Sequence, residues 1–278
     1  MDVTAFHRAG FAALSDLRAP GYDAIFEKLE ATQIDFNAQA PTFRDPAYQW
    51  GPGETLRTWA RAWEYAYVSY HVGRECAARN GAIDVADFGS GSTFFPFAIA
   101  RLGANVVCLD NDPICVTDMT GAARALDTGS GSVRVLQSGT TLPLADASID
   151  VAYSVSVLEH MPDPVPIITE LARIVKPGGA FVLTLDLDFE GGASGVSVPH
   201  FYALMDHLRV RFDWKYADHT VPPLDILTSK NSPWPRPGER NVPGLLWRTK
   251  ERRYLPLIGG PDPGILTVYG CTLQRRAS

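Results

Sequence analysis

The sequence predicts an α/β fold built around a parallel sheet. Short apolar runs that suit buried strands alternate with segments of helical spacing between residues 83 and 185. In the first such unit, the glycine-rich turn GSG at 89–91 follows a strand and opens a helix. In the last, KPGG at 176–179 joins a helix to an apolar strand. A strand–turn–helix order that recurs along the chain is typical of βαβ units, whose strands lie parallel.

The first unit begins with residues 83–88, an apolar run dense enough for a strand buried on both faces. Gly89 and Gly91 break this run. Glycine allows tight backbone angles and leaves no side chain to block a ligand. The helical pattern that starts at Thr93 ends at Gly103. The turn is therefore expected to expose backbone amides beside a helix N-terminus, at the carboxyl edge of the sheet.

The second strand, 105–109, ends at Asp110. Nucleotide-binding units place a ribose-binding carboxylate about twenty positions after the glycines, where Asp110 lies. The unit thus predicts a nucleoside or dinucleotide site. A dinucleotide fingerprint needs a third glycine where Phe94 stands, so a bulky residue occupies the approach of a pyrophosphate. Asp87, two residues before Gly89, is placed to hold the amino group of an amino-acid-bearing nucleoside.

Later motifs give the chain a family resemblance. LPL at 142–144 is followed by DASID at 146–150, an apolar strand at 151–155 and LEHM at 158–161. Together with DFGSG at 87–91 and KPGG before the strand 180–185, this order resembles the class I S-adenosylmethionine-dependent methyltransferases. The resemblance covers residues 83–188.

The resemblance implies a more detailed fold and a cofactor. We expect a seven-stranded doubly wound sheet, mostly parallel, with one antiparallel strand near the C-terminus. The implied cofactor is S-adenosyl-L-methionine, which leaves as S-adenosyl-L-homocysteine. Its methionine end would lie at Asp87 and the glycine turn, its ribose at Asp110 and its adenine near Ser138. The implied cofactor-binding residues are Asp87, Gly89, Ser90, Gly91, Asp110, Asn111, Ser138, Gly139 and Ser154, the last near the sulfonium.

Residues 1–80 precede the first core strand and form a predicted helical leader or cap. Its expected helices are 22–36 and 54–79. Residues 81–278 are the predicted methyltransferase domain. Within it, the stretch 220–263 holds nine prolines and two tryptophans. Proline removes backbone donors and fixes backbone angles, so we expect an irregular lid inserted into the domain.

The remaining elements alternate as the fold requires. Helices are expected at 113–127, 165–175 and 199–210. Strands are expected at 133–137, 151–155, 180–185, 211–216 and 265–274. The last of these strands would form the antiparallel hairpin that the resemblance implies.

The chain of 278 residues is long enough for one sizeable α/β domain with additions. Its net charge of −6 argues against a general nucleic-acid binder. Residues 228–278 hold nine Lys or Arg and three Asp or Glu, a local +6, so the first 227 residues carry −12. This basic stretch either forms a solvated surface or attracts an anionic small-molecule acceptor. No segment approaches the ~20 apolar residues that cross a bilayer, so no membrane partner is expected.

The four cysteines indicate a reducing compartment. Cys76, Cys108, Cys115 and Cys271 form no CxxC pair and stand in no metal-ligand spacing with histidines. The N-terminus is also a poor secretory signal. These features predict a cytoplasmic protein without a metal site. The sequence does not indicate an oligomeric state.

Methyl transfer from a sulfonium depends mainly on the alignment of the reacting atoms and on the exclusion of water. A hydroxyl acceptor often needs a general base as well, near the carboxyl edge of the sheet. The candidate catalytic residues are His160 after the fourth strand, Asp186 after the fifth strand and His200 beside the next helix. Each also has a structural interpretation, in which it only shapes the pocket.

Three functions remain open. The favoured one is S-adenosylmethionine-dependent methylation of a small molecule at oxygen, with secondary metabolites, sugars and glycan precursors as acceptors. The second is a nicotinamide-dependent oxidoreductase, against which Phe94 and the block 142–150 argue. The third is a non-catalytic protein that binds S-adenosylmethionine. The strand 151–155 leads into no NPPY-type motif, which argues against methylation of nucleic-acid bases.

Overall fold

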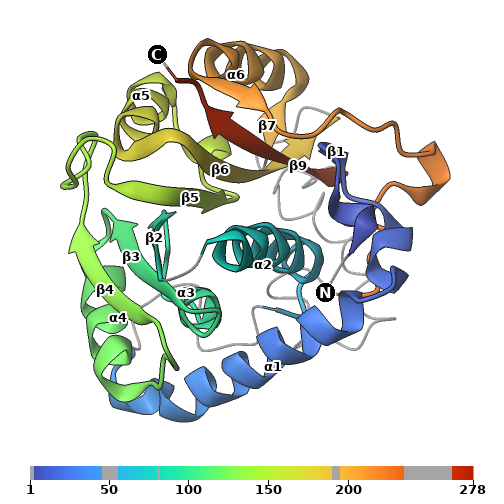
Figure 1. Cartoon of the computed structure of the whole chain (residues 1–278). Coiled ribbons are helices and arrows are strands. Elements are labelled where there is room, and N and C mark those ends of the chain that lie inside the picture. The colour runs from blue at the N-terminus through green and yellow to red at the C-terminus, as the bar shows by residue number, and fades with distance from the viewer. Residues whose placement is uncertain (1–2, 46–55, 80–81, 190–194, 235–264, 278) are drawn as a thin grey trace, which may run out of the picture.

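The computed structural model describes residues 3–45, 56–79, 82–189, 195–234 and 265–277 (Figure 1). Its strands are β1 (Gly10–Phe11), β2 (Ile83–Phe88), β3 (Ala104–Asp110), β4 (Ser132–Gln137), β5 (Ile149–Val155), β6 (Val175–Asp188), β7 (Val196–Ser197), β8 (Phe212–Trp214) and β9 (Leu266–Arg275). Its α-helices are α1 (Tyr22–Gln39), α2 (Arg61–Ala78), α3 (Phe95–Ala100), α4 (Pro113–Ala125), α5 (Val165–Ile174) and α6 (Val198–Arg211). Short 3-10 helices are η1 (Thr4–Phe6), η2 (Leu14–Arg18), η3 (Ala40–Thr42), η4 (Leu158–His160) and η5 (Pro223–Asp225).

The strands form one sheet, in the order β1-β9-β6-β5-β2-β3-β4 across the described residues, with β7 beside β6 and β8 beside β9. Neighbours from β4 to β6 are parallel. β9 runs antiparallel to β6, β1 and β8. The prediction of a mostly parallel sheet with an antiparallel strand near the C-terminus is therefore confirmed. The strand count differs slightly from seven because β1 and β7 add two short pairings of two residues each.

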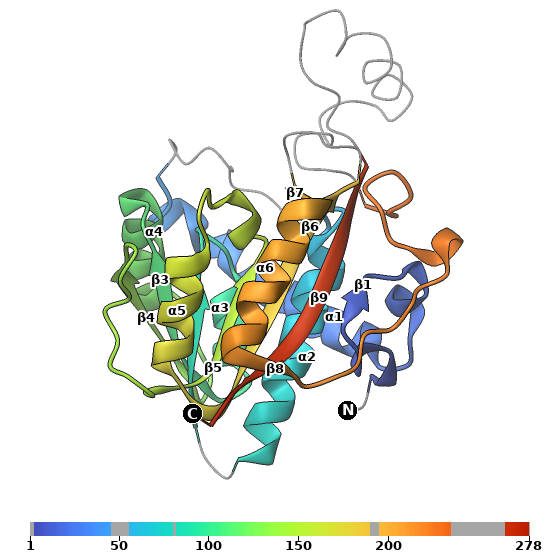
Figure 2. The same ribbon diagram turned by 90° about the horizontal axis from the view of Figure 1, so that it is seen from above.

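Helices cover both faces of the sheet. α1 to α4 lie on one face, and α5 and α6 lie on the other (Figures 1 and 2). The first layer buries residues such as Phe36, Phe97 and Met119 against the sheet. The second layer buries residues such as Leu171 and Leu208. Strands covered on both faces carry nearly continuous apolar runs, which is why the sequence predicted them clearly.

The aromatic helix α2 packs directly on β6 and β9. Trp63 and Tyr67 stack with ring centroids 4.7 Å apart and lie over Gly270 of β9. A Cβ at Gly270 would lie 2.6 Å from the Trp63 ring, so only glycine permits this close approach. The aromatic residues that the sequence shows between 59 and 70 are thus largely core.

Two predicted boundaries differ from the structure. The helix expected from residue 54 begins at Arg61, and residues 56–60 form turns. The KPGG connector at 176–179 belongs to β6, because Val175 already pairs with Ile149. The register then shifts, and Gly178 with φ of 76° lets the chain bulge before the regular ladder resumes at Ala180.

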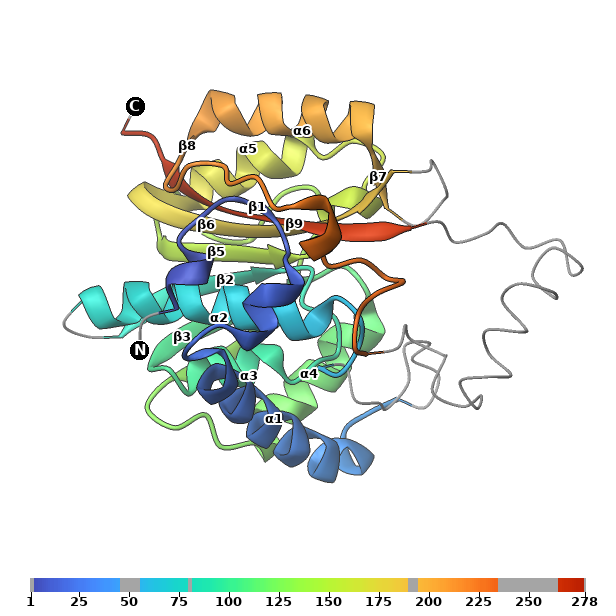
Figure 3. The same cartoon turned by 90° about the vertical axis from the view of Figure 1, so that its right-hand side faces the viewer.

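The leader adds an edge strand that the sequence did not predict. β1 pairs with β9, placing Gly10 opposite Gly270, and lies beside β9 in Figure 3. The carbonyl of Ala12 accepts a bond of 2.8 Å from the amide of Leu227, so the leader is also tied to the start of the predicted lid. Two residues carry no readable strand pattern, which explains why β1 was missed.

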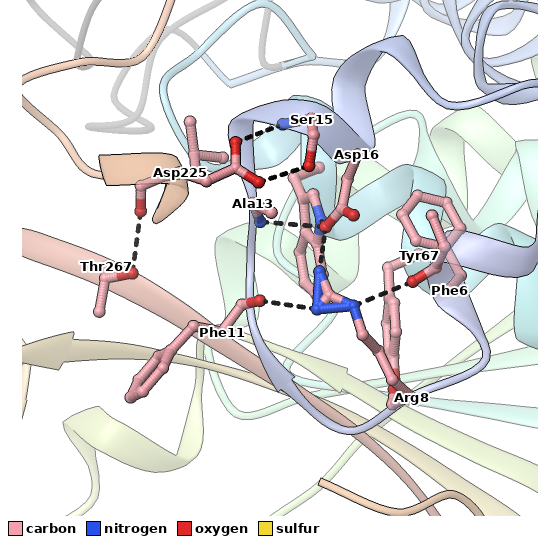
Figure 4. A network of polar contacts seen from close by, with 12 residues as sticks. Phe6, Arg8, Phe11, Ala13, Ser15, Asp16, Tyr67, Asp225 and Thr267 are labelled. Carbon is pink, nitrogen blue, oxygen red and sulfur yellow. Dashed lines mark hydrogen bonds and ion pairs between the residues drawn. The ribbon is translucent and has the colours of Figure 1, made fainter. Parts of the chain in front are cut away.

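A polar network fixes this leader segment (Figure 4). The buried Asp16 accepts hydrogen bonds from Ala13 N at 3.0 Å and Trp63 Nε1 at 2.7 Å, and it pairs with Arg8 at 2.5 Å. Ser15 donates its amide and hydroxyl to Asp225. Sheet, leader and α2 therefore share one core in the described residues, while the boundary at residue 80 between two domains stays a prediction.

Most of the predicted lid, 235–263, lies outside the described residues. Its first part, 220–234, runs along the leader and contains η5. Across the described ranges, none of the helices has the length and apolar character needed to span a membrane.

Candidate functional site

The turn between β2 and α3 adopts backbone angles that favour glycine. Gly89 has φ of 74° and Gly91 has φ of 55°. The amide of Gly89 donates to Leu109 O at 2.8 Å, and the amide of Gly91 donates to Asp110 Oδ2 at 2.8 Å. The half-buried Asp110 carboxylate at the end of β3 is thereby fixed beside the turn, as the ribose prediction requires.

Asp87 lies buried at the end of β2. Burial raises the pKa of its carboxyl to about 8, the Tyr153 hydroxyl opposes this rise in part, and the charge of Asp110 adds to it. A carboxyl in such a position stays largely protonated at neutral pH until a cation arrives. Asp87 is thus suited to receive an ammonium group.

The three residues expected near the adenine are Asn111, Ser138 and Gly139, which lie close to Asp110. Ser138 is buried, and its amide donates to Asp110 O at 2.8 Å. A Cβ at Gly139 would meet nothing within 4 Å, so open space lies over that residue. Asn111 is exposed at the end of β3. These three residues and Asp110 surround one side of the turn.

A second group of polar side chains lies at the carboxyl ends of β5 and β6. Ser156 directly precedes Val157, and Val157 packs against Gly89, so this group adjoins the glycine turn. We call it the polar cluster. It comprises Arg61, Glu64, Ser156, Glu159, Thr184 and Asp186.

Glu64 of α2 is the centre of the polar cluster and is fully buried. Its Oε1 accepts hydrogen bonds from Ser156 Oγ at 2.6 Å and from Thr184 Oγ1 at 2.7 Å. Its Oε2 pairs with Arg61, which also donates to Ser156 Oγ at 2.8 Å. Ser156 Oγ lies 3.4 Å from Asp186 Oδ1, so the network reaches the end of β6.

Ser156 holds this arrangement through its backbone. It has φ of 50°, which is uncommon for a residue other than glycine, and its amide donates to Thr184 O at 3.1 Å. Backbone angles of this kind concentrate at functional sites. The unusual turn points the Ser156 hydroxyl back toward α2.

Glu159 completes the polar cluster from η4. Its Oε1 accepts a bond of 3.1 Å from the amide of Asp186. Its Oε2 is buried and has no hydrogen-bond partner among the residues that the structure describes. Burial, and then the charge of Asp186, raises the pKa of Glu159 well above its ordinary value.

Comparison with known proteins agrees with this geometry. Residues 86–183 match the family model described as a methyltransferase domain. An uncharacterized methyltransferase of Mycobacterium sp. (strain JLS) is 42% identical over 104 residues, which are 37% of this chain and 39% of the relative. One from Mycobacterium bovis (strain BCG / Pasteur 1173P2) is 33% identical over 159 residues, or 55% of this chain and 58% of the relative. Over residues 86–183 the chain is thus similar to a methyltransferase domain.

Solved structures support the fold of this methyltransferase domain and its surroundings. The [4+2]-cyclase SpnF has a TM-score of 0.56 at 17% identity, covering 98% of this chain and 100% of that chain. The MccD protein has a TM-score of 0.50 at 8% identity, and the match covers 76% of this chain and 97% of that chain. At such identities the likeness concerns the fold alone. The chain spans about two-fifths of the length of the first Mycobacterium relatives, 39%.

S-adenosylmethionine is the cofactor that this likeness implies, and the residues present suit it. In the glycine turn the Gly91 amide is bound by the Asp110 carboxylate. Among the described residues no cation offsets the buried Asp87 carboxyl, so the cofactor ammonium would supply one. Ser154 Oγ of β5 is completely buried and has no hydrogen-bond partner in the described part of the chain. The assignment of individual residues to parts of the cofactor stays a prediction.

The three predicted catalytic residues do not lie together in the structure. Asp186 belongs to the polar cluster. His160 is exposed at the end of η4, where partial burial of its ring and the charge of Arg61 lower its pKa. His200 is exposed on α6, with its Nδ1 at 3.0 Å from Ser197 Oγ. Asp186 and His160 thus adjoin the same cluster, whereas His200 lies on a helix of the opposite layer.

Sequence reasoning missed Arg61, Glu64 and Glu159. Glu159 stands inside the LEHM motif beside His160, so its position in the motif was a usable signal. Arg61 and Glu64 lie in the predicted helix 54–79, whose dense aromatic residues indicate either packing or a leader that supplies part of the acceptor site. No local pattern shows that Glu64 meets Thr184, which is 120 positions away.

In the described part of the chain, two cavities lie away from the glycine turn and the polar cluster. One of about 540 Å³ is lined by η2, Asp225, Asn231 and Trp234. A second cavity, of about 310 Å³, is lined by some of the residues in the segments 4–16 and 219–225. Neither contains a predicted cofactor residue. Among the described residues, no three His, Cys, Asp or Glu side chains are grouped so that they would hold a metal ion.

Gly89→Ala will destabilise the protein by about 3 kcal/mol, because a positive φ and a steric clash act together. A Cβ at Gly89 would lie 2.5 Å from Val157 Cγ2. Thermal unfolding should show a midpoint about 10 °C lower. The side chain of Val157 already fills the space beside Gly89. Glycine is therefore needed here for packing, in addition to any role in letting a ligand approach.

Two controls separate these causes. Gly139→Ala, where a Cβ meets nothing within 4 Å, should change stability by less than about 0.5 kcal/mol. Adding Val157→Ala to Gly89→Ala should restore the part of the loss that comes from the clash. If the double variant recovers nothing, the contact with Val157 does not constrain the turn.

Proposed function

We propose that the protein transfers the methyl group of S-adenosylmethionine to a hydroxyl oxygen of a small-molecule acceptor. The observation that carries this proposal is the polar cluster at the carboxyl ends of β5 and β6, next to the glycine turn. Ligands of open α/β sheets bind at that edge. Packing of Val157 on Gly89 joins the predicted cofactor site to the cluster.

When bound, S-adenosylmethionine supplies an activated methyl group and leaves as a neutral thioether. The chain's own residues then have to hold three parts of the cofactor. Asp87 would take its ammonium, Asp110 its ribose hydroxyls, and the segment at Ser138 and Gly139 its adenine. Asn111, Ser90 and Ser154 would complete the lining, as the sequence predicted.

Asp186 is the proposed proton acceptor. It is nearly buried, at 9% exposure, and its Oδ1 lies 3.4 Å from Ser156 Oγ. The Asp186 carboxylate would take the proton that the acceptor hydroxyl loses and return it to water after the product leaves. A base held in place by such a network contributes about 10²–10⁴-fold to the rate. His160 would remain at the rim of the site, and no contact of His200 supports a catalytic role.

A cytoplasmic location also remains part of the proposal. None of the four cysteines, all of which lie in the described ranges, forms a disulfide. Cys108, Cys115 and Cys271 are buried, as small apolar side chains of a reduced protein would be.

Titration calorimetry tests the proposed cofactor. S-adenosylhomocysteine should bind with a dissociation constant of about 10 μM or lower, whereas NAD and NADP should not bind. Since the pKa of Asp87 is about 8 before binding, its carboxyl is mostly protonated at neutral pH and ionises when the ammonium arrives. Binding should therefore release about one proton, measurable in buffers that differ in ionisation enthalpy.

Asp87→Asn is the matched control, because it keeps the shape of the side chain and cannot release a proton. It should bind more weakly and release none. Binding of NAD instead would favour the oxidoreductase and overturn the proposal. Binding of S-adenosylhomocysteine without methylation of any hydroxyl acceptor would favour a binding protein, or another reaction on the same fold.

A further inference from the structure

A row of buried polar side chains crosses the sheet just before the glycine turn. Asp87 of β2 pairs in register with Tyr153 of β5 on one side and with Cys108 of β3 on the other. Residues that pair in register point to the same face of a sheet, so the three side chains lie next to one another under the layer of α1 to α4. Tyr153 and Cys108 are 0% exposed, and Asp87 is 4% exposed. Water therefore hardly reaches this row.

Aromatic packing fixes the ring of Tyr153. Phe95, the first residue of α3, meets this ring edge to face, with the ring centroids 5.4 Å apart. Phe95 in turn stacks on Tyr65 of α2, with centroids 4.3 Å apart. A fully buried ring in such packing has little freedom to move. The fold, and not a mobile side chain, therefore places the Tyr153 hydroxyl.

This hydroxyl has no settled partner. It lies near enough to the Asp87 carboxyl to lower the pKa of that group. It nevertheless makes no hydrogen bond of ordinary distance and angle with any described residue. A second buried hydroxyl without a partner, that of Ser90, lies beside the Cys108 thiol at the other end of the row. Buried hydroxyls are nearly always hydrogen-bonded, so an unbonded one beside a carboxyl indicates a function.

The groups around Asp87 explain when the Tyr153 hydroxyl would bond to it. β3 contributes Asp110 and Cys108, α2 contributes Tyr65, and β5 contributes Tyr153. None of these groups is a cation. Because burial raises the pKa of Asp87 to about 8, its carboxyl is mostly neutral at pH 7. A neutral carboxyl accepts a weaker hydrogen bond than a carboxylate does, so the contact with the hydroxyl would strengthen when Asp87 becomes charged.

We propose that Tyr153 is the positioning residue of Asp87: its hydroxyl donates to the carboxylate that forms when a ligand ammonium arrives, and this makes the site select an amino-acid-bearing nucleoside over a plain nucleoside. The inference rests on the proposed function, in which Asp87 takes the cofactor ammonium. The proton of Asp87 leaves to the solvent, and two donors, the ammonium and the hydroxyl, replace it. Tyr153 keeps its own proton, because burial, and then the charge of Asp87, raises its pKa well above the ordinary value.

Tyr153→Phe should separate affinity from stability. S-adenosylhomocysteine should bind about tenfold more weakly, since a hydrogen bond to a charged group is lost. The melting temperature should stay within about 2 °C of wild type, because the hydroxyl bonds nothing in the ligand-free protein. 5′-Methylthioadenosine keeps the adenine, ribose and thioether but has no ammonium, so its affinity should change by less than about twofold. Calorimetry with the full-length protein measures both affinities.

Two further variants serve as controls. Tyr22 is also buried, and its hydroxyl donates to Ala62 O at 3.1 Å. Tyr22→Phe should therefore lower the melting temperature and leave the affinity for S-adenosylhomocysteine within about twofold of wild type. Asp87→Ala removes the acceptor of the proposed bond. In that background, adding Tyr153→Phe should weaken binding by less than about twofold, which a double-mutant cycle measures.

The pH dependence of the affinity is a readout that a merely structural role would not change. Asp87 has to lose its proton to bind an ammonium, so the affinity of the wild type for S-adenosylhomocysteine should rise with pH and level off near the pKa of about 8. Phenylalanine removes the hydroxyl that lowers this pKa. In Tyr153→Phe the rise should therefore continue to a higher pH, whereas Tyr22→Phe should level off where the wild type does.

Each other outcome counts against the inference. It is overturned if Tyr153→Phe keeps the affinity for S-adenosylhomocysteine, weakens both ligands by the same factor, or melts far below the wild type. It is also overturned if the full effect persists in the Asp87→Ala background, since the hydroxyl then acts on another group. If the wild type binds both ligands equally well, Asp87 takes no ammonium, and the inference fails while the nucleoside site stands. If the wild type binds neither ligand, the proposed function itself fails.

Discussion

Asp110→Ala will weaken binding of S-adenosylhomocysteine by about a hundredfold or more. A carboxylate that accepts two ribose hydroxyls makes two charge-assisted hydrogen bonds, each contributing about 1.5–3 kcal/mol. Their loss corresponds to about 10²–10⁴ in affinity. Calorimetric titration measures this change. A thermal unfolding curve of the variant checks that it is folded at the temperature of the titration.

The structure shows why Asp110 needs a careful control. Its Oδ2 accepts from Gly91 N at 2.8 Å, and its Oδ1 accepts from Asp112 N at 2.9 Å. Alanine therefore also loosens the glycine turn. Asp112→Ala removes a local cap, the bond from Ile114 N at 2.8 Å, and touches no predicted ribose contact. Equal loss of affinity in both variants would assign the effect to the turn and remove the ribose role of Asp110.

Glu64→Ala will lower the free energy of unfolding by about 3 kcal/mol, since removing one partner of a buried ion pair leaves the other uncompensated. Glu64 is 0% exposed and binds Arg61, Ser156 and Thr184. The side chain of Arg61 is 29% exposed, so water relieves part of the cost. The expected fall in melting temperature is about 10 °C.

Glu64→Gln is the matched variant. It keeps the oxygen that accepts from the two hydroxyls but replaces the oxygen that pairs with Arg61 by an amide NH2, so its loss should be about half as large. Glu75→Ala on the same helix should cost less than about 1 kcal/mol, because its side chain pairs with partly exposed Arg79 and Lys215. If the free energy of unfolding falls no more in Glu64→Ala than in Glu75→Ala, Glu64 is not the central residue of the polar cluster.

Much of the fold was predictable because its signals are local. The strand at 83–88 and the turn at 89–91 appear as expected, since an apolar run followed by glycines has few alternatives in an α/β protein. The helix α4 begins at Pro113, where proline suits the first turn and Asp112 caps it. Boundaries failed where tertiary pairing overrides local preference, as at Val175, which joins the sheet before the KPGG segment.

The proximity of the predicted cofactor residues could also be inferred from the sequence, while their roles stay predictions. Asp87, Gly89, Gly91 and Asp110 follow one another within a single βαβ unit, so their order in the chain fixes their proximity. The polar cluster has no such order. Its members come from a leader helix, a turn after β5 and the end of β6.

By itself, the sequence determined the βαβ framework, the glycine turn and the cofactor family, because each depends on residues that are close along the chain. Only the tertiary structure decided that α2 places Arg61 and Glu64 against Ser156 and Thr184, and that Glu159 anchors Asp186. It also decided that the leader adds β1 to the sheet edge. The physical reason is that a buried charge requires partners in space, and neither hydrophobic periodicity nor motif spacing records which distant partners the fold supplies.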